Sequence, residues 1–254
     1  FKGGAYEKRT PIVKKLLATA LMAMSFTAAA IPQISVGQMY EFIDGDKSTL
    51  LKRIMNNGDN TAFIKTEVSE ITWNANGQKN EKRFDASAIS NASVDGLIVT
   101  PARMIVPAKN MQPARFIVTG SRDKERYYRV RFIPVMPKDQ YEFGQTKKDF
   151  DDYSKKLNAG VNVLTGFGTI AVVRPKNATF NTTIQSEGNS ITIRNNGNST
   201  IVLDNIKQCA GNNCSESAST ILLPGKQHQL RKEVKKSWQF TLLEGRKKTP
   251  KTFG

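Results

Sequence analysis

Alternating apolar and polar positions predict β-strands along most of this chain. The clearest stretch is 97–134, where turn-forming residues separate short apolar runs, LIVTPARMIV, ARFIVTG and RYYRVRFI. These runs are too short for a typical helix, and their Val, Ile, Phe and Tyr residues favour strands. We expect consecutive antiparallel strands here. Because a sheet with one apolar face must bury it on a second sheet, the stretch predicts an all-β sandwich.

Similar patterns extend this prediction toward the N-terminus. Loose alternation at 33–43 predicts a first edge strand, and further strands are expected at 48–55 and 62–73. The stretch 74–93 is polar, and its Asn76-Gly77 pair predicts a turn.

A charged segment at 136–160 interrupts the strand pattern, and its length is uncommon inside compact domains. We expect this segment to be mobile in the free protein. The apolar run VNVLTGFGTIAVVRP follows at 161–175. A buried strand explains 170–173, but the first half of the run would be a long exposed edge, which is an aggregation hazard.

The pattern changes after Arg174-Pro175-Lys176-Asn177, which is typical of a linker. Short strands with Asn- and Gly-rich turns follow, and ILLPGKQHQL and SWQFTLLEG each predict one further strand. Four apolar side chains are expected to face a core: Ile191, Ile193, Ile201 and Leu203. We therefore predict an N-terminal domain at 31–174 and a smaller β domain at 175–254.

The beginning of the chain is typical of a secretory signal peptide. The stretch 13–30, VKKLLATALMAMSFTAAA, has a positive start, an apolar middle and a small-residue cleavage site. Its apolar part is shorter than the ~20 residues that span a bilayer, so we expect no stable membrane insertion. We interpret 1–12 as translated upstream sequence, Val13 as the true start and Ile31 as the approximate mature N-terminus.

The net charge of +16 indicates either an acidic partner, such as nucleic acid, or a lysine-rich soluble surface. Export argues against nucleic acid. The chain has one histidine, His228, which we expect at the surface, and no phosphate-binding loop or paired-carboxylate motif. A secreted enzyme, a metal site and a bound cofactor are therefore disfavoured.

The two cysteines, Cys209 and Cys214, enclose a short loop, CAGNNC. In an exported protein this spacing predicts a disulfide rather than a thiol pair or a metal site. Such a short loop restricts the unfolded chain modestly, so the bond should stabilise the fold by ~2 kcal/mol.

Arginines lie within the apolar block at 97–134. Arg129 and Arg131 are two positions apart and therefore share one face of their strand. One interpretation is that these arginines simply project from the solvent face of the strand. The other is that these arginines, beside Tyr127, clamp a carboxylate through charge-assisted hydrogen bonds.

The order of these features resembles the periplasmic pilus-assembly chaperones of the chaperone–usher pathway. The motifs that carry the resemblance are TPARMIVPA, KERYYRVRF, the long insert and GTIAVVRP, followed by a second domain. Similarity is greatest to the alternate class and to chaperones of the enterobacterial common pilus, through ISVGQMYEFIDGDKSTL and the short cysteine loop. The resemblance implies two immunoglobulin-like β-sandwich domains in an L shape, a periplasmic location and no enzymatic activity.

The same resemblance implies partners and a mechanism. The partners would be pilin subunits, both major and tip, and an outer-membrane usher. The chaperone would lend an exposed strand at 161–169 to an incomplete pilin, which is donor-strand complementation. A bulge at the two glycines of this strand would shift its register. The side chains expected on the donor strand are Val161, Val163 and Phe167 on one face, Leu164 on the other, and Thr169. An exposed donor strand also favours a self-capped dimer of the free protein.

Members of the family hold the pilin's C-terminal carboxylate with an Arg on the first strand and a Lys on the donor strand. This sequence has no Arg at 38–43, and Thr169 or Ile170 stands at the Lys position. We expect Arg129 to be the anchor, with Arg103 and Arg174 as alternatives. 

The family pattern also implies a salt bridge of Arg174 with Glu125 and Glu244 that sets the angle between the domains. This role would compete with an anchoring role for Arg174. A buried pair of this kind specifies geometry more reliably than it adds stability.

The alternative to a chaperone is a structural protein, a pilin or surface adhesin with two β domains. Pilins carry an N-terminal extension of alternating apolar residues, and 31–42 has a similar pattern.

Overall fold

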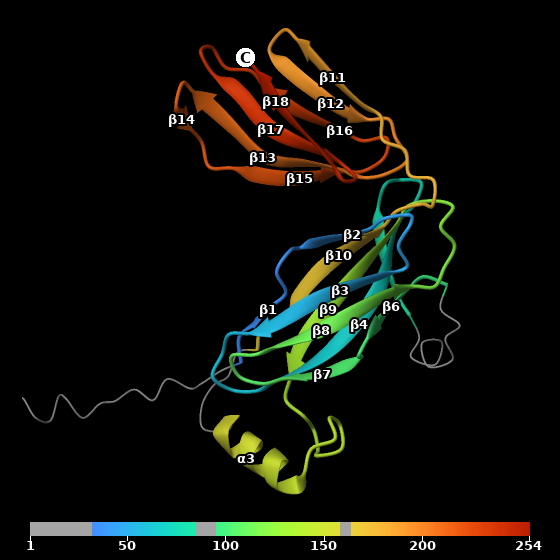
Figure 1. The fold of residues 1–254 in the computed structure, drawn as a ribbon, viewed down its shortest axis with the longest axis vertical. Coiled ribbons are helices and arrows are strands. Elements are labelled where there is room, and N and C mark those ends of the chain that lie inside the picture. The colour runs from blue at the N-terminus through green and yellow to red at the C-terminus, as the bar shows by residue number, and fades with distance from the viewer. Residues whose placement is uncertain (1–31, 85–94, 158–163) are drawn as a thin grey trace, which may run out of the picture.

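The structure, a computed structural model, describes residues 32–84, 95–157 and 164–254. The expected signal peptide lies outside the described residues, as do Val161 and Val163 of the expected donor strand. Two strand-built domains meet beside the linker (Figure 1). In the described part of the chain, no helix is long and apolar enough to cross a bilayer.

The N-terminal domain has two sheets. The strand order is β1-β3-β8-β6 in one sheet and β2-β10-β9-β4-β5 in the other, where β7 also pairs with β4. The first sheet contains β1 (Ile34–Ser35), β3 (Thr49–Asn56), β8 (Met111–Val118) and β6 (Leu97–Thr100). The second contains β2 (Tyr40–Ile43), β10 (Phe167–Val173), β9 (Arg126–Val135), β4 (Ala62–Trp73), β5 (Lys79–Arg83) and β7 (Arg103–Val106).

The facing sides of these sheets form one hydrophobic core. On β9 the alternate side chains Tyr128, Val130 and Phe132 are fully buried. Burial of each such side chain contributes about 1.5–3 kcal/mol. The positions between them, including Arg129 and Arg131, therefore lie on the outer face of the sheet, as the alternation predicts.

The strands expected at 97–134 are antiparallel, but neighbours in sequence do not pair with each other. LIVTPARMIV is divided at Pro101 into β6 and β7, which belong to different sheets. β8 then pairs with β3 and β6, whereas β9 pairs with β4 and β10. The prediction of consecutive antiparallel strands in a sandwich holds, but the partner of each strand lies elsewhere in the chain, because a chain that builds a sandwich crosses repeatedly between the two sheets.

Two further differences lie near the N-terminus. The expected edge strand at 33–43 is divided into β1 and β2, and Gly37 between them has φ +66°, which favours glycine. The polar stretch after Trp73 contains a strand, β5, that pairs with the end of β4. Strand β5 reads KNEKR and has no apolar residue, so hydrophobic alternation does not reveal it.

The insert at 136–160, expected to be mobile, contains a docked helix, α3 (Lys147–Leu157). Thr146 caps it by accepting a hydrogen bond from the backbone N of Asp149 (3.2 Å). The ring of Tyr153 packs edge-on against that of Phe63, with 4.7 Å between centroids. The Tyr153 hydroxyl also donates to the carbonyl of Thr61 (3.1 Å). The ring of Phe143, also in the insert, packs edge-on against Phe63 as well, with 5.1 Å between centroids. The expectation of a mobile segment did not take these aromatic contacts into account.

The C-terminal domain is a smaller sandwich of two sheets with its own core. The three-stranded sheet contains β11 (Thr182–Glu187), β12 (Ser190–Asn195) and β16 (Gln227–Arg231). The five-stranded sheet contains β14 (Asn213–Cys214), β13 (Ile201–Ala210), β17 (Ser237–Glu244), β18 (Lys247–Phe253) and β15 (Ala218–Leu222). The four side chains expected in the core are fully buried: Ile191, Ile193, Ile201 and Leu203.

Two details of this domain bear on the sequence predictions. ILLPGKQHQL is not one strand, because its Pro224-Gly225 turn separates β15 in one sheet from β16 in the other. The expected disulfide is confirmed: Cys209 and Cys214 are bonded at the paired ends of β13 and β14. The prediction of an all-β fold with two immunoglobulin-like domains is confirmed as well.

Candidate functional site

Strand β10 has an open edge at its beginning. Its pairing with β9 runs from Phe167 to Val173, but its pairing with β2 begins only at Ile170. There the backbone N of Ile170 donates to the carbonyl of Met39 (2.8 Å). Within the described residues, Phe167 and Gly168 therefore have a neighbouring strand only on the β9 side.

The side chains of β10 alternate between the core and the outer face. Phe167 packs against the core, and Thr169 is fully buried, with its hydroxyl donating to the carbonyl of Met39 (2.9 Å). Thr169 is thus held by its own domain, which corrects its assignment to the donated segment. Leu164, just before the strand, is half-buried.

A cluster of three cations around one carboxylate lies on the outer face of the same sheet. Glu81 of β5 accepts hydrogen bonds from Nε of Arg129 (2.8 Å) and Nη2 of Arg131 (2.7 Å). Nζ of Lys79 lies 2.8 Å from Oε1 of Glu81. The hydrogen bond from Lys79, followed by those from the arginines, lowers the pKa of Glu81 to about 2. We call Lys79, Glu81, Arg129 and Arg131 the carboxylate cluster.

The carboxylate cluster borders a small cavity between the domains, with a volume of about 200 Å³. Arg129 and Lys79 line it together with Tyr40 and Ile170, which are paired across β2 and β10. Leu223 of the C-terminal domain lines its other side. The cavity therefore combines apolar walls with cationic groups, a composition that suits the end of a peptide chain.

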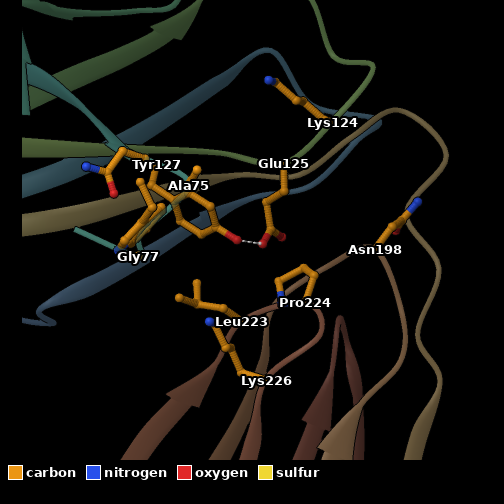
Figure 2. Close-up of a pocket in the computed structure, with 11 residues that line it drawn as sticks. Ala75, Gly77, Lys124, Glu125, Tyr127, Asn198, Leu223, Pro224 and Lys226 are labelled. Carbon is orange, nitrogen blue, oxygen red and sulfur yellow. Dashed lines mark hydrogen bonds between the residues drawn. The ribbon is translucent and has the colours of Figure 1, made fainter. Parts of the chain in front are cut away.

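A larger cavity of about 590 Å³ lies next to it at the domain junction (Figure 2). Trp73 packs edge-on against Tyr127, with 5.2 Å between ring centroids. The hydroxyl of Tyr127 donates to Oε1 of Glu125 at 2.5 Å. Leu223 and Pro224 face these residues from the C-terminal domain. Trp73, Tyr127 and Leu223 line both cavities, so the two form one cleft.

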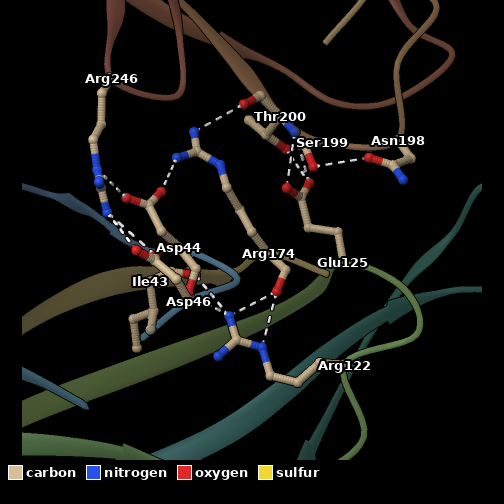
Figure 3. A network of polar contacts seen from close by, with 10 residues as sticks. All are labelled: Ile43, Asp44, Asp46, Arg122, Glu125, Arg174, Asn198, Ser199, Thr200 and Arg246. Carbon is tan, nitrogen blue, oxygen red and sulfur yellow. Dashed lines mark hydrogen bonds and ion pairs between the residues drawn. The ribbon is translucent and has the colours of Figure 1, made fainter. Parts of the chain in front are cut away.

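Glu125 connects the two domains at the inner end of this cleft (Figure 3). It accepts hydrogen bonds from the backbone N of Thr200, at 2.8 and 3.0 Å, and from its hydroxyl. Burial raises the pKa of the Glu125 carboxyl, although these hydrogen bonds and that of Tyr127 oppose the shift.

Arg174 is the second connection and is almost completely buried. Its guanidinium lies between the rings of Phe42 and Phe180, 4.6 and 5.2 Å from their centroids. Nη1 pairs with Asp44 (2.7 Å), and Nη2 donates to the carbonyl of Thr200 (3.2 Å) (Figure 3). Nε of Arg174 has no hydrogen-bond partner, but it is buried like the rest of the guanidinium, so the side chain is closed off from a ligand.

The turn after β2 is held against the linker by further contacts. Arg246 of the C-terminal domain pairs with Asp44 (3.2 Å) and Asp46 (3.0 Å). Arg122 donates to the carbonyls of Asp44 and Arg174, both at 2.7 Å. A Cβ at Gly45 would lie 2.4 Å from the carbonyl oxygen of Pro175, so only glycine permits this approach.

The predicted salt bridge of Arg174 has the wrong partners. Arg174 pairs with Asp44, while Glu125 bonds Thr200 and Glu244 accepts from Thr182 of its own domain (2.7 Å). The parallel pairing of β2 with β10 ends at Ile43 and Val173, which places the next residues of the two strands together. This long-range register cannot be read from the sequence.

The structure also separates the three predicted anchors. Arg129 faces the cleft and Arg174 is enclosed. Arg103 of β7 lies opposite Lys65 of β4 in the strand register, toward the end of β4 that is far from Trp73. Lys79 and Glu81 are functional-site residues that the hydrophobic pattern of the sequence did not predict. The only signal for them is the alternation of charge in KNEKR after a turn.

Comparison with known proteins adds to this geometry. No family model matches the chain. Proteins named "Probable fimbrial chaperone EcpB" from Escherichia coli (strain SMS-3-5 / SECEC) and Shigella boydii serotype 4 (strain Sb227) are 29% identical over 218 residues, which is 84% of this chain and 86% of each relative. The chain is related to the fimbrial chaperones. The resemblance expected from the motifs is confirmed.

Solved structures of fimbrial chaperones share the fold. The Class 5 fimbriae chaperone CfaA has a TM-score of 0.52 at 18% identity, over 87% of this chain and 99% of CfaA. A chain of the Salmonella enterica complex of SafA pilin with the SafB chaperone has a TM-score of 0.52 at 12% identity, over 89% of this chain and 98% of that one.

Proposed function

We propose that this protein is a periplasmic chaperone of pilin subunits. It binds a subunit by donor-strand complementation, stabilises it and delivers it to an outer-membrane usher for fimbria assembly. The observation that carries this proposal is the open edge of β10 before Ile170, which lies in the same sheet as the carboxylate cluster. The relationship to fimbrial chaperones supports it.

The mechanism follows from the edge of the sheet. An unpaired strand offers its backbone N–H and C=O groups to another chain, and its apolar side chains can fill pockets of an incomplete sandwich. The pilin would extend along β10 toward the cleft and place its C-terminal carboxylate at Arg129. Binding of this kind requires no covalent chemistry, so the protein acts as a stoichiometric partner and not as an enzyme.

We assign residues 31–174 to the domain that binds the pilin and 175–254 to the domain that completes the cleft. The two cores support this division, since β1 to β10 build one and β11 to β18 build the other. The export signal expected in the sequence supports the periplasmic location.

The alternative function, a pilin or adhesin, required 31–42 to be an extension that inserts into another subunit. In the structure, β1 pairs with β3 and β2 pairs with β10, so this part of the chain belongs to its own two sheets. No observation favours the alternative.

Co-purification from the periplasm tests the proposal. Tagged wild-type protein should retain a small pilin in a one-to-one complex, identified by mass spectrometry. The double variant Val161→Ser/Val163→Ser should lose the pilin, because polar side chains no longer fill apolar pockets. Leu51→Ser is the matched control, since it removes an exposed apolar group from β3 in the other sheet of the domain and should retain the pilin. Retention by the double variant would contradict the donor assignment.

A further inference from the structure

Glu81 makes contacts that the proposed binding mechanism does not by itself explain. It comes from β5, a strand without apolar residues, and it draws Lys79, Arg129 and Arg131 to one carboxylate. About a quarter of its side chain is exposed. The cluster borders the cleft through Lys79 and Arg129, and this location indicates a purpose besides stability.

The orientation of Arg129 indicates that purpose. Its Nε atom donates to Glu81, so one edge of the guanidinium is committed to β5. Its Nη1 atom reaches toward β10, where a Cβ built on Gly168 would lie 3.7 Å away. Arg129 therefore extends across the outer face of the sheet, from its anchor on Glu81 to the strand with the open edge.

Gly168 leaves the space that this orientation needs. It lies opposite Arg131 on β9, and a Cβ there would also lie 3.9 Å from Cδ of Arg129. A larger side chain would extend from that Cβ into the volume that the guanidinium occupies. A Cβ at these distances would be in ordinary van der Waals contact, so the space beside Gly168 limits side chains longer than that of alanine.

We propose that Glu81 is a positioning residue for the pilin carboxylate. It holds the Nε edge of Arg129 so that the Nη groups are directed at the cleft beside β10 before any subunit arrives. This inference rests on the proposed function, in which Arg129 is the anchor, and it identifies Glu81 as the residue that holds Arg129 in place. Because the hydrogen bonds from Lys79 and the arginines lower the pKa of Glu81, its carboxylate is ionised at neutral pH and this support is present there.

Preorganisation has a measurable advantage. A free arginine side chain loses rotamer entropy when it binds a carboxylate, and an arginine already held by Nε loses less. Loss of Glu81 should weaken binding by this entropic argument. By electrostatics alone it should strengthen binding, because it removes a negative charge near the incoming carboxylate. The sign of the change in affinity therefore distinguishes a positioning residue from a competing anion.

The test uses the full chain and the peptide acetyl-Ala-Ala-Ala-Ala, as the free acid and as the C-terminal amide. Binding is followed by the NMR signal of the Nε–H group of Arg129. We expect the wild type to prefer the acid and Glu81→Ala to bind the acid about tenfold more weakly, which corresponds to about 1.4 kcal/mol. Glu81→Gln should lose less, since its amide oxygen still accepts from Nε.

Two controls make the result specific. Glu67→Ala removes a carboxylate that pairs with Arg83, within the same sheet, and should leave the affinity unchanged. In an Arg129→Ala background, Glu81→Ala should have no further effect, because a positioning residue acts only through the group it holds.

Several outcomes would overturn the inference: tighter binding by Glu81→Ala, an equal loss in Glu67→Ala, an additive loss in the double variant, or no preference of the wild type for the acid. Each leaves the chaperone function intact, provided that pilin still co-purifies with the wild type. Conversely, failure to retain a pilin would contradict the proposed function without bearing on the peptide measurement.

Discussion

Arg129 lies on β9 and Arg174 directly follows its partner strand β10, yet the surroundings of the two arginines differ completely. Arg129 is 27% exposed and shares one acceptor with two other cations. Arg174 is 5% exposed, lies between two aromatic rings and uses its Nη groups on Asp44 and Thr200. The comparison teaches that burial separates a charge that holds domains together from a charge that remains available to a partner.

The largest expected effect is on the enclosed arginine. Arg174→Ala should lower the free energy of unfolding by about 3 kcal/mol, because it leaves Asp44 without its buried partner and a void between two rings. Urea denaturation measures this change, and small-angle scattering should show a wider range of domain orientations. Arg115→Ala, at an exposed position of β8, is the control and should change neither quantity. If Arg174→Ala were as stable as Arg115→Ala, the distinction between the buried Arg174 and the exposed Arg129 would not hold.

The next effect concerns binding. Arg129→Ala should weaken pilin capture by about 2 kcal/mol or more, because the carboxylate loses its cationic partner in a partly desolvated cleft. The unfolding free energy should change by less than about 1 kcal/mol, as expected for a half-exposed ion pair. Titration of the co-purified pilin against chaperone measures the affinity. Arg103→Ala should bind as the wild type does; a loss there instead would move the anchor to β7.

The smallest effects are those of pH, and they have opposite signs in the two regions. The pKa of Glu81 lies below its ordinary value of 4.5, so its stabilisation is present above that value and is lost as the pH falls toward about 2. The pKa of Glu125 is raised by burial, so its contribution is present below the ordinary value and is lost as the pH rises through the higher one.

Gln variants sharpen this contrast. Glu81→Gln should reduce the slope of unfolding free energy on the acid side of pH 4.5, and Glu125→Gln should reduce the decline above it. Thermal unfolding at a series of pH values measures both slopes. If both variants changed the pH dependence of the unfolding free energy in the same direction, the two carboxylates would not differ as described.

The sequence by itself determined the class of fold, the two domains and the family resemblance. These properties are local: alternation along β9 places Val130 and Phe132 inside and Arg129 and Arg131 outside, and the short CAGNNC loop brings its cysteines together. Such patterns are set within a few residues and need no knowledge of the partner strand.

Only the tertiary structure decided which residues meet. The register of β2 against β10 gave Arg174 the partner Asp44 instead of Glu125, and the pairing of β5 with β4 brought Glu81 to Arg129. These contacts join residues far apart in the chain, and a shift of a strand by one residue would move every side chain to the other face. Sequence alternation indicates the face of a side chain, but the packing of strands selects its neighbour.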